Sequence, residues 1–235
     1  MQRQPRKNHI LASLPESVFQ TWEPFFEFVE LPLGQVICEQ GGTLSHIYFP
    51  TSCIVSWVHL LENGASTEIS MTGREGLVGL YQIMGARQTT NRALVQTGGS
   101  AVRLRLNAVL ASFQQDMRVQ QIILGFAQAL ITQMAQVSVC RQHHSLEEQL
   151  CRMLLFTLDR QDRPTIFLTQ ELMANLLGVR REGVTLAASR LMKDGVIDYA
   201  RGRITVNDRA ALQTRTCECY DVVQHAYERL QTPPV

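Results

Sequence analysis

The segment LTQELMANLLGVRREGVTLAASRLMKDGVIDYARGRITV, residues 168–206, decides the fold of the C-terminal part of the chain. Thr169 can accept the first backbone N–H groups of a helix, and leucines then recur at helical spacing. Gly178 ends that helix, because glycine enters the left-handed conformation without steric cost. A second helix is predicted over about residues 181–193. Two helices joined by a short glycine turn are the geometry of a helix-turn-helix, whose second helix enters the DNA major groove.

The outward face of the second helix carries side chains that can read base edges. Arginine pairs with the O6 and N7 atoms of guanine, and glutamate accepts from the N4 amine of cytosine. Arg180 falls at the N-cap, where it caps poorly and its charge opposes the helix dipole, so a nearby phosphate or base would explain its presence. A solvated charged face is the alternative interpretation. The residues expected to read bases are Arg180, Arg181, Glu182, Thr185 and Ser189.

A β-hairpin is predicted directly after this helix, with strands over residues 196–199 and 204–206 and two arginines at its tip. Between residues 160 and 203 the chain carries eight basic and five acidic side chains, a net charge of +3, whereas the whole chain carries +1. Positive charge is therefore concentrated where a phosphate backbone would lie. The residues expected to bind phosphates are Thr169, Gln170, Arg201 and Arg203.

Composition describes an ordinary globular protein, with 45% hydrophobic and 18% charged residues in a chain of 235. No run of eighteen apolar residues occurs, so we expect no membrane span and no membrane partner. The basic N-terminal stretch lacks the apolar core of a secretion signal, which favours a cytoplasmic protein whose cysteines are reduced. Catalytic motifs such as a Ser/His/Asp arrangement or a glycine-rich phosphate loop are missing, so an enzyme is not expected.

Short apolar segments separated by glycine-containing turns predict an antiparallel β-barrel or jelly roll in the N-terminal half. This pattern does not distinguish a barrel around a ligand cavity from a barrel with a packed core. A short helical lead-in over residues 11–22 precedes the strands. The strands are expected over residues 27–31, 36–39, 47–50, 54–61, 66–72, 92–97 and 101–106.

From residue 107 the apolar period becomes helical and continues for roughly seven turns without a proline. Ile123, Leu130 and Val137 are seven residues apart, which is typical of a coiled-coil-like contact between two copies of the chain. A long helix that packs on its own barrel is the alternative, because Ile122 and Ile131 compete with this seam. The expected dimer interface consists of Ile123, Phe126, Leu130, Met134 and Val137.

These features predict an α+β protein in three parts. A β-barrel or jelly-roll domain is expected over residues 11–113, a dimerisation helix over 114–144 and a winged helix-turn-helix domain over 145–235. The expected partners are double-stranded DNA and a second copy of the chain, since two-fold protein symmetry matches paired half-sites.

The sequence requires no cofactor, and we expect no metal site. The six cysteines are scattered, and Cys217-x-Cys219 lacks a second pair at a useful spacing. Buried apolar thiols are therefore the favoured interpretation. The segment Cys140-x-x-His143-His144 could place ligands at the domain hinge, but a structural role is favoured there because imidazole complements the negative end of a helix.

The order of barrel, long helix, helix-turn-helix and basic hairpin resembles the Crp/Fnr family of bacterial transcription regulators over nearly the whole chain. The likeness is most specific at Arg181-Glu182-x-Val184, which matches the family's recognition-helix motif. The resemblance implies a dimeric regulator with a cyclic-nucleotide-binding-like barrel that senses an effector, whose identity stays unknown. A contact with RNA polymerase would come from loops such as 61–65, where no residue demands one.

Two departures from the family pattern affect the expected function. Leu186 stands where the recognition helix usually carries a second arginine, so the half-site is expected to differ at that base pair; leucine packs on a thymine methyl. The cyclic-nucleotide members carry a Gly-Glu pair and a later arginine that neutralises the cyclic phosphate. Here the corresponding stretch is Gly79-Leu80, and Arg92 falls out of register.

We therefore expect no tight binding of cyclic AMP in the usual way, because the charge-assisted contacts are lost. Gly79, Leu80 and Arg92 are still the residues expected to line an effector pocket. The alternative is a regulator that needs no effector, in which the barrel is a structural or protein-contact module.

Overall fold

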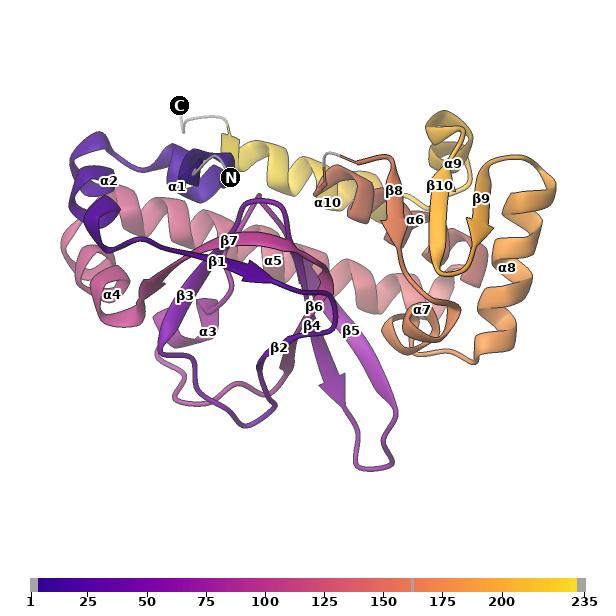
Figure 1. The fold of residues 1–235 in the computed structure, drawn as a ribbon, viewed down its shortest axis with the longest axis horizontal. Coiled ribbons are helices and arrows are strands. Elements are labelled where there is room, and N and C mark those ends of the chain that lie inside the picture. Colours follow the sequence, from indigo (N-terminus) through magenta and orange to yellow (C-terminus); the bar gives the residue numbers. More distant parts are fainter. Residues whose placement is uncertain (1–3, 162, 232–235) are drawn as a thin grey trace.

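The N-terminal half of the computed structural model, which describes residues 4–161 and 163–231, is a sandwich of two antiparallel sheets. One sheet has the strand order β1-β7-β3 and the other β2-β6-β4-β5 (Figure 1). The strands are β1 (Glu27–Leu31), β2 (Val36–Cys38), β3 (His46–Pro50), β4 (Ile54–Leu60), β5 (Ser66–Thr72), β6 (Arg92–Thr97) and β7 (Gly99–Arg105). The predicted strands and the antiparallel jelly-roll architecture are confirmed, with strand ends that differ by two residues at most.

The space between the two sheets is filled by side chains. Val55, Trp57 and Val95 from β4 and β6 are almost fully buried there. The Trp57 ring meets Tyr81 edge-on, with ring centroids 5.5 Å apart. Such a layer of β-branched and aromatic side chains forms a packed core of its own.

Helices cover the open end of the sandwich and were only partly predicted. The lead-in is two helices, α1 (His9–Ser13) and α2 (Glu16–Trp22), flanked by the 3-10 turns η1 (Pro5–Lys7) and η2 (Glu23–Phe25). The short helix α3 (Leu80–Ile83) was not predicted, since four residues show no period. The Asn8 side chain begins α1 by accepting from Leu11 N at 3.2 Å.

The predicted long helix is in fact two helices, α4 (Leu106–Gln115) and α5 (Met117–His143). Asp116 separates them, because its carboxylate caps α5 and accepts from Arg118 N at 2.8 Å and Val119 N at 3.2 Å. Helix α5 runs behind the sheets and links the two lobes (Figure 1). By length and composition α5 could cross a membrane, although it contains no continuous run of eighteen apolar residues; a core helix passes the same test, and 39% of its most apolar window is buried.

The C-terminal lobe, from α6 onward, is a helix-turn-helix with a three-stranded sheet. Its sheet has the order β8-β10-β9, and β8 was not predicted because three residues beside Pro164 give little signal. The elements are α6 (Leu146–Asp159), β8 (Thr165–Phe167), α7 (Gln170–Leu177), α8 (Arg181–Lys193), β9 (Ile197–Ala200), β10 (Arg203–Val206), α9 (Arg209–Thr214), α10 (Cys219–Glu228) and the 3-10 turn η3 (Arg229–Gln231).

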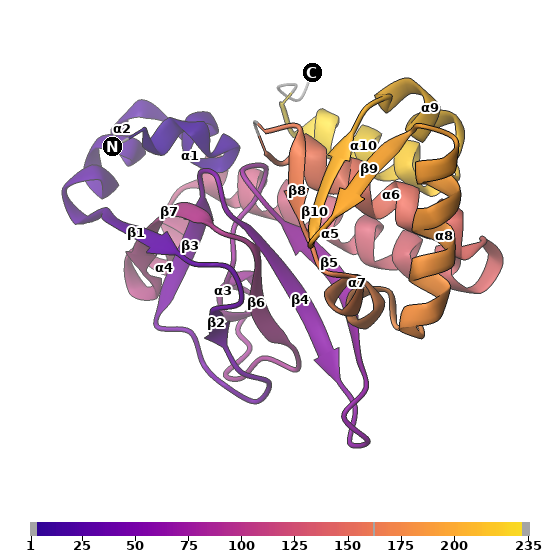
Figure 2. The same ribbon diagram turned by 45° about the vertical axis from the view of Figure 1, so that its right-hand side comes forward.

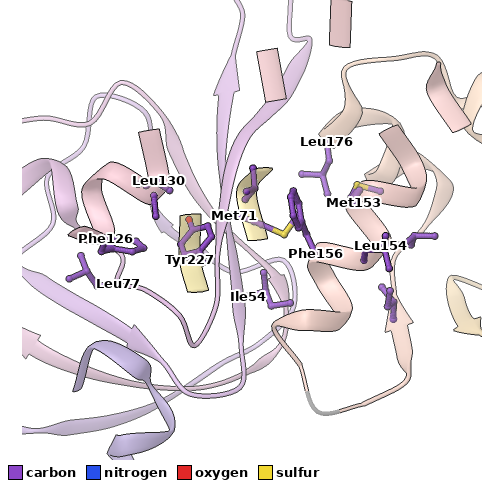
Figure 3. Packing of buried hydrophobic residues seen from close by; sticks show 14 of the residues in the cluster. Ile54, Met71, Leu77, Phe126, Leu130, Met153, Leu154, Phe156, Leu176 and Tyr227 are labelled. Carbon is purple, nitrogen blue, oxygen red and sulfur yellow. The ribbon is translucent and has the colours of Figure 1, made fainter. Parts of the chain in front are cut away.

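One hydrophobic cluster runs through both lobes. Met71 of β5 lies beside Phe156 of α6, and Phe126 of α5 faces Tyr227 of α10 with ring centroids 6.4 Å apart (Figure 3). Helix α10 packs antiparallel to α5, since Gly125 meets Leu230 at one end. The two lobes therefore share a single core in this conformation.

Candidate DNA-binding surface

The helix-turn-helix forms for the local reasons that the sequence indicates. Thr169 begins α7, and its hydroxyl accepts from Leu172 N at 3.1 Å. Gly178 ends α7 with φ +71°, in the left-handed region. Val184 and Leu191 of α8 are fully buried and hold the helix against α6 and α7. Figure 2 shows α8 at the outer edge of the C-terminal lobe.

All five residues predicted to read bases are exposed on this face of α8. Arg180 is the N-cap residue and makes no side-chain capping hydrogen bond, so its guanidinium is available to a ligand. The Thr185 hydroxyl lies 2.9 Å from Gln170 Oε1 and 3.0 Å from Arg181 O, which ties α8 to α7. Ser189 donates to Thr185 O at 2.8 Å, and both hydroxyl oxygens keep lone pairs for base donors.

The wing hairpin turns through two residues rather than three. Arg201 has φ +52° and Gly202 has φ +77°, and Ala200 pairs with Arg203 across the turn. Two successive positive φ angles are the geometry of a type I′ turn, which matches the twist of the two strands. Arg203 is thus the first residue of β10, a correction to its predicted place in the turn, and both arginines are exposed.

The positive charge of this lobe is divided between its surface and its core. Within residues 4–161 and 163–231, none of Arg180, Arg181, Arg201 and Arg203 forms an ion pair. Arg160, counted above among the bases of the DNA-reading segment, is buried and lies 2.7 Å from Glu75 Oε1. It therefore contributes no charge to the surface that would face DNA, which corrects that part of the charge argument.

A buried polar chain connects the sandwich to the C-terminal lobe, where Gln96 Nε2 donates to Thr157 Oγ1 of α6 at 3.4 Å. Ser56 Oγ lies 2.5 Å from Glu68 Oε2 and 2.7 Å from Gln96 Oε1. One hydroxyl proton cannot serve two acceptors, so a protonated Glu68 that donates to Ser56 satisfies the chain. Burial raises the pKa of Glu68 to about 7, against the Ser56 hydrogen bond and the nearby Arg152 and Arg141 charges.

The residues predicted for an effector pocket have other contacts in this arrangement. Gly79 has φ +114°, and a Cβ there would lie 2.5 Å from Ile47 Cδ1, so this glycine permits close packing. Leu80 is buried in the core, and Arg92 Nε donates to Glu39 Oε2 at 2.7 Å. An earlier Gly-Leu pair, Gly76-Leu77, also has a buried leucine. Neither Gly-Leu pair therefore supplies the carboxylate of the family's Gly-Glu pair.

Comparison with protein families identifies both lobes. A cyclic nucleotide-binding domain matches residues 28–116, and a Crp-like helix-turn-helix domain matches residues 148–215. The chain belongs to the Crp/Fnr family of transcription regulators. No curated protein sequence matches the chain.

Solved structures of Crp/Fnr regulators share the fold. A transcriptional regulator of the crp/fnr family from Eubacterium rectale has a TM-score of 0.66 at 15% identity, over 89% of this chain and 98% of the other. FixK2 from Bradyrhizobium japonicum has a TM-score of 0.68 at 14% identity, over 82% and 98%. The c-di-GMP responsive regulator CLP from Xanthomonas campestris has a TM-score of 0.65 at 12% identity, over 83% and 100%.

The predicted dimer interface of this Crp/Fnr regulator lies inside its own core. Ile123, Phe126, Leu130 and Val137 are buried against the sandwich and the C-terminal lobe, and Met134 is half-buried. The prediction was wrong because α5 is apolar on two faces, and a seven-residue repeat does not say which face packs on the chain's own barrel.

The cysteines are less scattered than their spacing indicates. Cys140 at the end of α5 meets Cys217 and Cys219 at the start of α10, and His144 joins them. All six cysteines are buried, as expected, but this cluster corrects the expectation that they are scattered. The signal that could have found the cluster is the pairing of Cys140-x-x-x-His144 with Cys217-x-Cys219, but the 72 residues between them hid it.

Proposed function

We propose that this Crp/Fnr regulator binds double-stranded DNA as a homodimer, with α8 in the major groove and the wing against the phosphates. The observation that carries the proposal is the set of exposed guanidinium groups, at the N-terminus of α8 and in the wing, that have no acidic partner in the part of the chain that the structure describes. Arginines in such positions pair with guanine edges and with phosphates. DNA binding also favours the cytoplasm as the location of the protein.

The face of α5 that is not covered by the rest of the chain supports dimerisation. Among its residues Met117, Leu124 and Ile131 are 73%, 51% and 60% exposed, which is unusual for large apolar side chains. Eight of the exposed positions of α5 recur at alternating spacings of four and three residues, as in the seam of a coiled coil. They are Met117, Gln121, Leu124, Gln128, Ile131, Ala135, Ser138 and Gln142, hereafter the α5 stripe. We propose this stripe as the dimer interface in place of the buried set.

The first experiment is recovery of genomic DNA bound to the tagged protein, followed by motif discovery. Two-fold symmetric half-sites about one helical turn apart support the dimer and the recognition helix together. Leu186 is 57% exposed on α8, so we expect a base pair read through a thymine methyl within each half-site. Absence of any enriched motif, both in cells and with purified protein at low salt, would refute sequence-specific binding.

Replacing Arg181 by alanine tests base reading. We expect a loss of about 1–3 kcal/mol on the preferred site and relaxed specificity at one base pair per half-site. Fluorescence anisotropy with a panel of single-base variants measures both effects. Arg87, an exposed arginine of the sandwich that lies outside both α5 and the C-terminal lobe, gives the control substitution. An equal loss on every sequence would show that Arg181 binds only the backbone.

Replacing Ile131 by aspartate tests the α5 stripe. In the proposed dimer the two Ile131 side chains are buried against the partner, and the substitution replaces them with two aspartates close together. We therefore expect the dimer dissociation constant to rise about 100-fold or more. Sedimentation equilibrium measures it directly. Leu33→Asp is the matched control, because Leu33 is 52% exposed on a turn of the sandwich. A variant that stays as dimeric as the control contradicts this interface.

The filled interior of the sandwich favours a second candidate, a regulator that needs no effector. Trp57 and its apolar neighbours occupy the space between the sheets, and the buried Leu77 and Leu80 stand where a Gly-Glu pair would supply a carboxylate. Titration calorimetry with cyclic AMP tests the leading view that the usual ligand is not bound tightly, and micromolar affinity would overturn it. If purified protein binds its motif fully without additions, the effector-independent alternative is favoured over a regulator with an unidentified effector.

The exposed tip of the β4–β5 hairpin, residues 61–65, is the proposed place for an RNA polymerase contact.

A further inference from the structure

Four side chains with metal-binding atoms meet where α5 ends and α10 begins. The Sγ atoms of Cys140, Cys217 and Cys219 and a ring nitrogen of His144 all lie within 4.8 Å of one another. Cys140 Sγ is 3.5 Å from Cys217 Sγ, and Cys219 Sγ is 3.6 Å from His144 Nδ1. The three thiols are 0–5% exposed and form a cluster separate from the main hydrophobic core.

We propose that Cys140, His144, Cys217 and Cys219 bind one zinc ion in a tetrahedral site. Zinc–sulfur bonds of about 2.3 Å and zinc–nitrogen bonds of about 2.0 Å place tetrahedral ligands roughly 3.5–3.8 Å apart. The two measured separations agree with this spacing. An iron–sulfur cluster would hold its thiolates farther apart, because they are distributed over two or more irons. Thiolate and imidazole ligands in a closed tetrahedral set select zinc.

The second ring nitrogen of the histidine has a partner as well. His144 Nε2 lies 3.2 Å from Glu218 Oε2, so it can donate to this carboxylate while Nδ1 faces the thiols. A carboxylate in this position fixes the ring and its tautomer in known metal sites. The backbone of His144 is also held, because Gln149 Nε2 donates to His144 O at 2.9 Å.

The charge of the filled site would also be compensated. Three thiolates and one zinc ion leave a net charge of −1, and the buried guanidinium of Arg152 lies beside the cluster. Zinc binds thiolates, so metal binding must displace the thiol protons and the affinity should fall as the pH is lowered.

The site would join two parts of the molecule that are remote in sequence. Cys140 and His144 belong to the end of α5, whereas Cys217 and Cys219 lead into α10, the last helix of the C-terminal lobe. A structural zinc ion there would fasten that lobe to the helix whose exposed stripe is proposed to carry the dimer contact. The role is a clamp, since all four ligand positions are taken by protein and none is left for substrate.

Metal analysis of the full chain, purified with a reductant, tests the site. We expect one zinc ion per chain in the natural protein and in Cys38→Ser, a matched control with a buried thiol in the sandwich. Cys140→Ser and Cys219→Ser should retain less than about a tenth of that metal. His144→Cys should retain it, because a set of four thiolates also binds zinc. Glu218→Gln should weaken binding about 10-fold.

Cobalt titration of metal-free protein keeps the test decisive if the serine variants fail to fold. Tetrahedral thiolate ligation gives intense visible bands together with sulfur-to-cobalt charge-transfer bands, and zinc should abolish them. Folded natural protein that contains no zinc and gives no such spectrum would overturn the proposal. So would a Cys140–Cys217 disulfide found in protein from reducing cells, or full zinc content in Cys140→Ser.

Discussion

Arginine side chains occur in two regions of the molecule with opposite surroundings. On the outer face of the C-terminal lobe, Arg180 and Arg181 are exposed and have no acidic partner among the described residues. At the junction of the two lobes, Arg152 and Arg160 are only 4% exposed. Nearby, Arg141 donates to Glu68 O at 2.5 Å and to Leu176 O at 3.0 Å, which joins the sandwich to α7.

The difference shows that charge alone does not identify a DNA-binding surface. A guanidinium that leaves water without a partner loses several kilocalories per mole of hydration, so the buried arginines need carboxylates or carbonyls around them. The exposed arginines keep their hydration and can exchange it for phosphate or base contacts. We therefore assign a stabilising role to the buried arginines at the junction of the lobes and a DNA-recognition role to the exposed arginines of the C-terminal lobe.

The largest expected effect comes from removing one partner of the buried pair. Glu75→Ala leaves Arg160 buried without its carboxylate, and we expect the free energy of unfolding to fall by about 3–5 kcal/mol. Glu39→Ala is the control, since Glu39 and Arg92 are also 2.7 Å apart but Glu39 is 58% exposed. The control should lose less than about 1 kcal/mol. Urea denaturation measures both, and equal losses would erase the distinction between the two regions.

A second test uses the pH dependence of the junction. The pKa of Glu68 is about 7 in the folded protein against 4.5 for an unperturbed glutamate. The folded state thus holds the Glu68 proton more tightly, so the contribution of Glu68 to stability is fully present below about pH 4.5 and declines as the pH rises through 7. The total decline from this group is about 3 kcal/mol. Glu68→Gln should remove this part of the slope, and an unchanged slope in thermal denaturation would contradict a neutral Glu68.

The smallest expected effect is at the wing. Arg203→Ala should weaken DNA binding by about 1 kcal/mol or less on all sequences alike and reduce the salt dependence of log K by about 1 per chain. Stability should not change, because Arg203 is exposed. Binding isotherms at several salt concentrations measure the slope. An altered sequence preference would move Arg203 from the phosphate-binding group to the base-reading group.

Local chemistry in the sequence was enough to predict the strands of the sandwich, the helix-turn-helix and the exposed arginines. Gly178, for example, is required by its positive φ, and Thr169 by the capping of α7. These features depend on neighbours a few residues away, which a single sequence displays. The same reasoning failed at Asp116, where one carboxylate divides a helical period into two helices.

Only the tertiary structure decided which surfaces meet. A Cβ on Gly178 would lie 2.8 Å from Thr67 Oγ1, a contact between the lobes that no local pattern reveals. The choice between the two apolar faces of α5, the burial of Arg160 against Glu75 and the meeting of Cys140 with Cys217 are of the same kind. The Arg160–Glu75 and Cys140–Cys217 contacts depend on packing between segments separated by 70 residues or more. The α5 case depends on which of its two apolar faces the rest of the chain covers. Periodicity records that a face is apolar, whereas its partner is set by the packing of the whole chain.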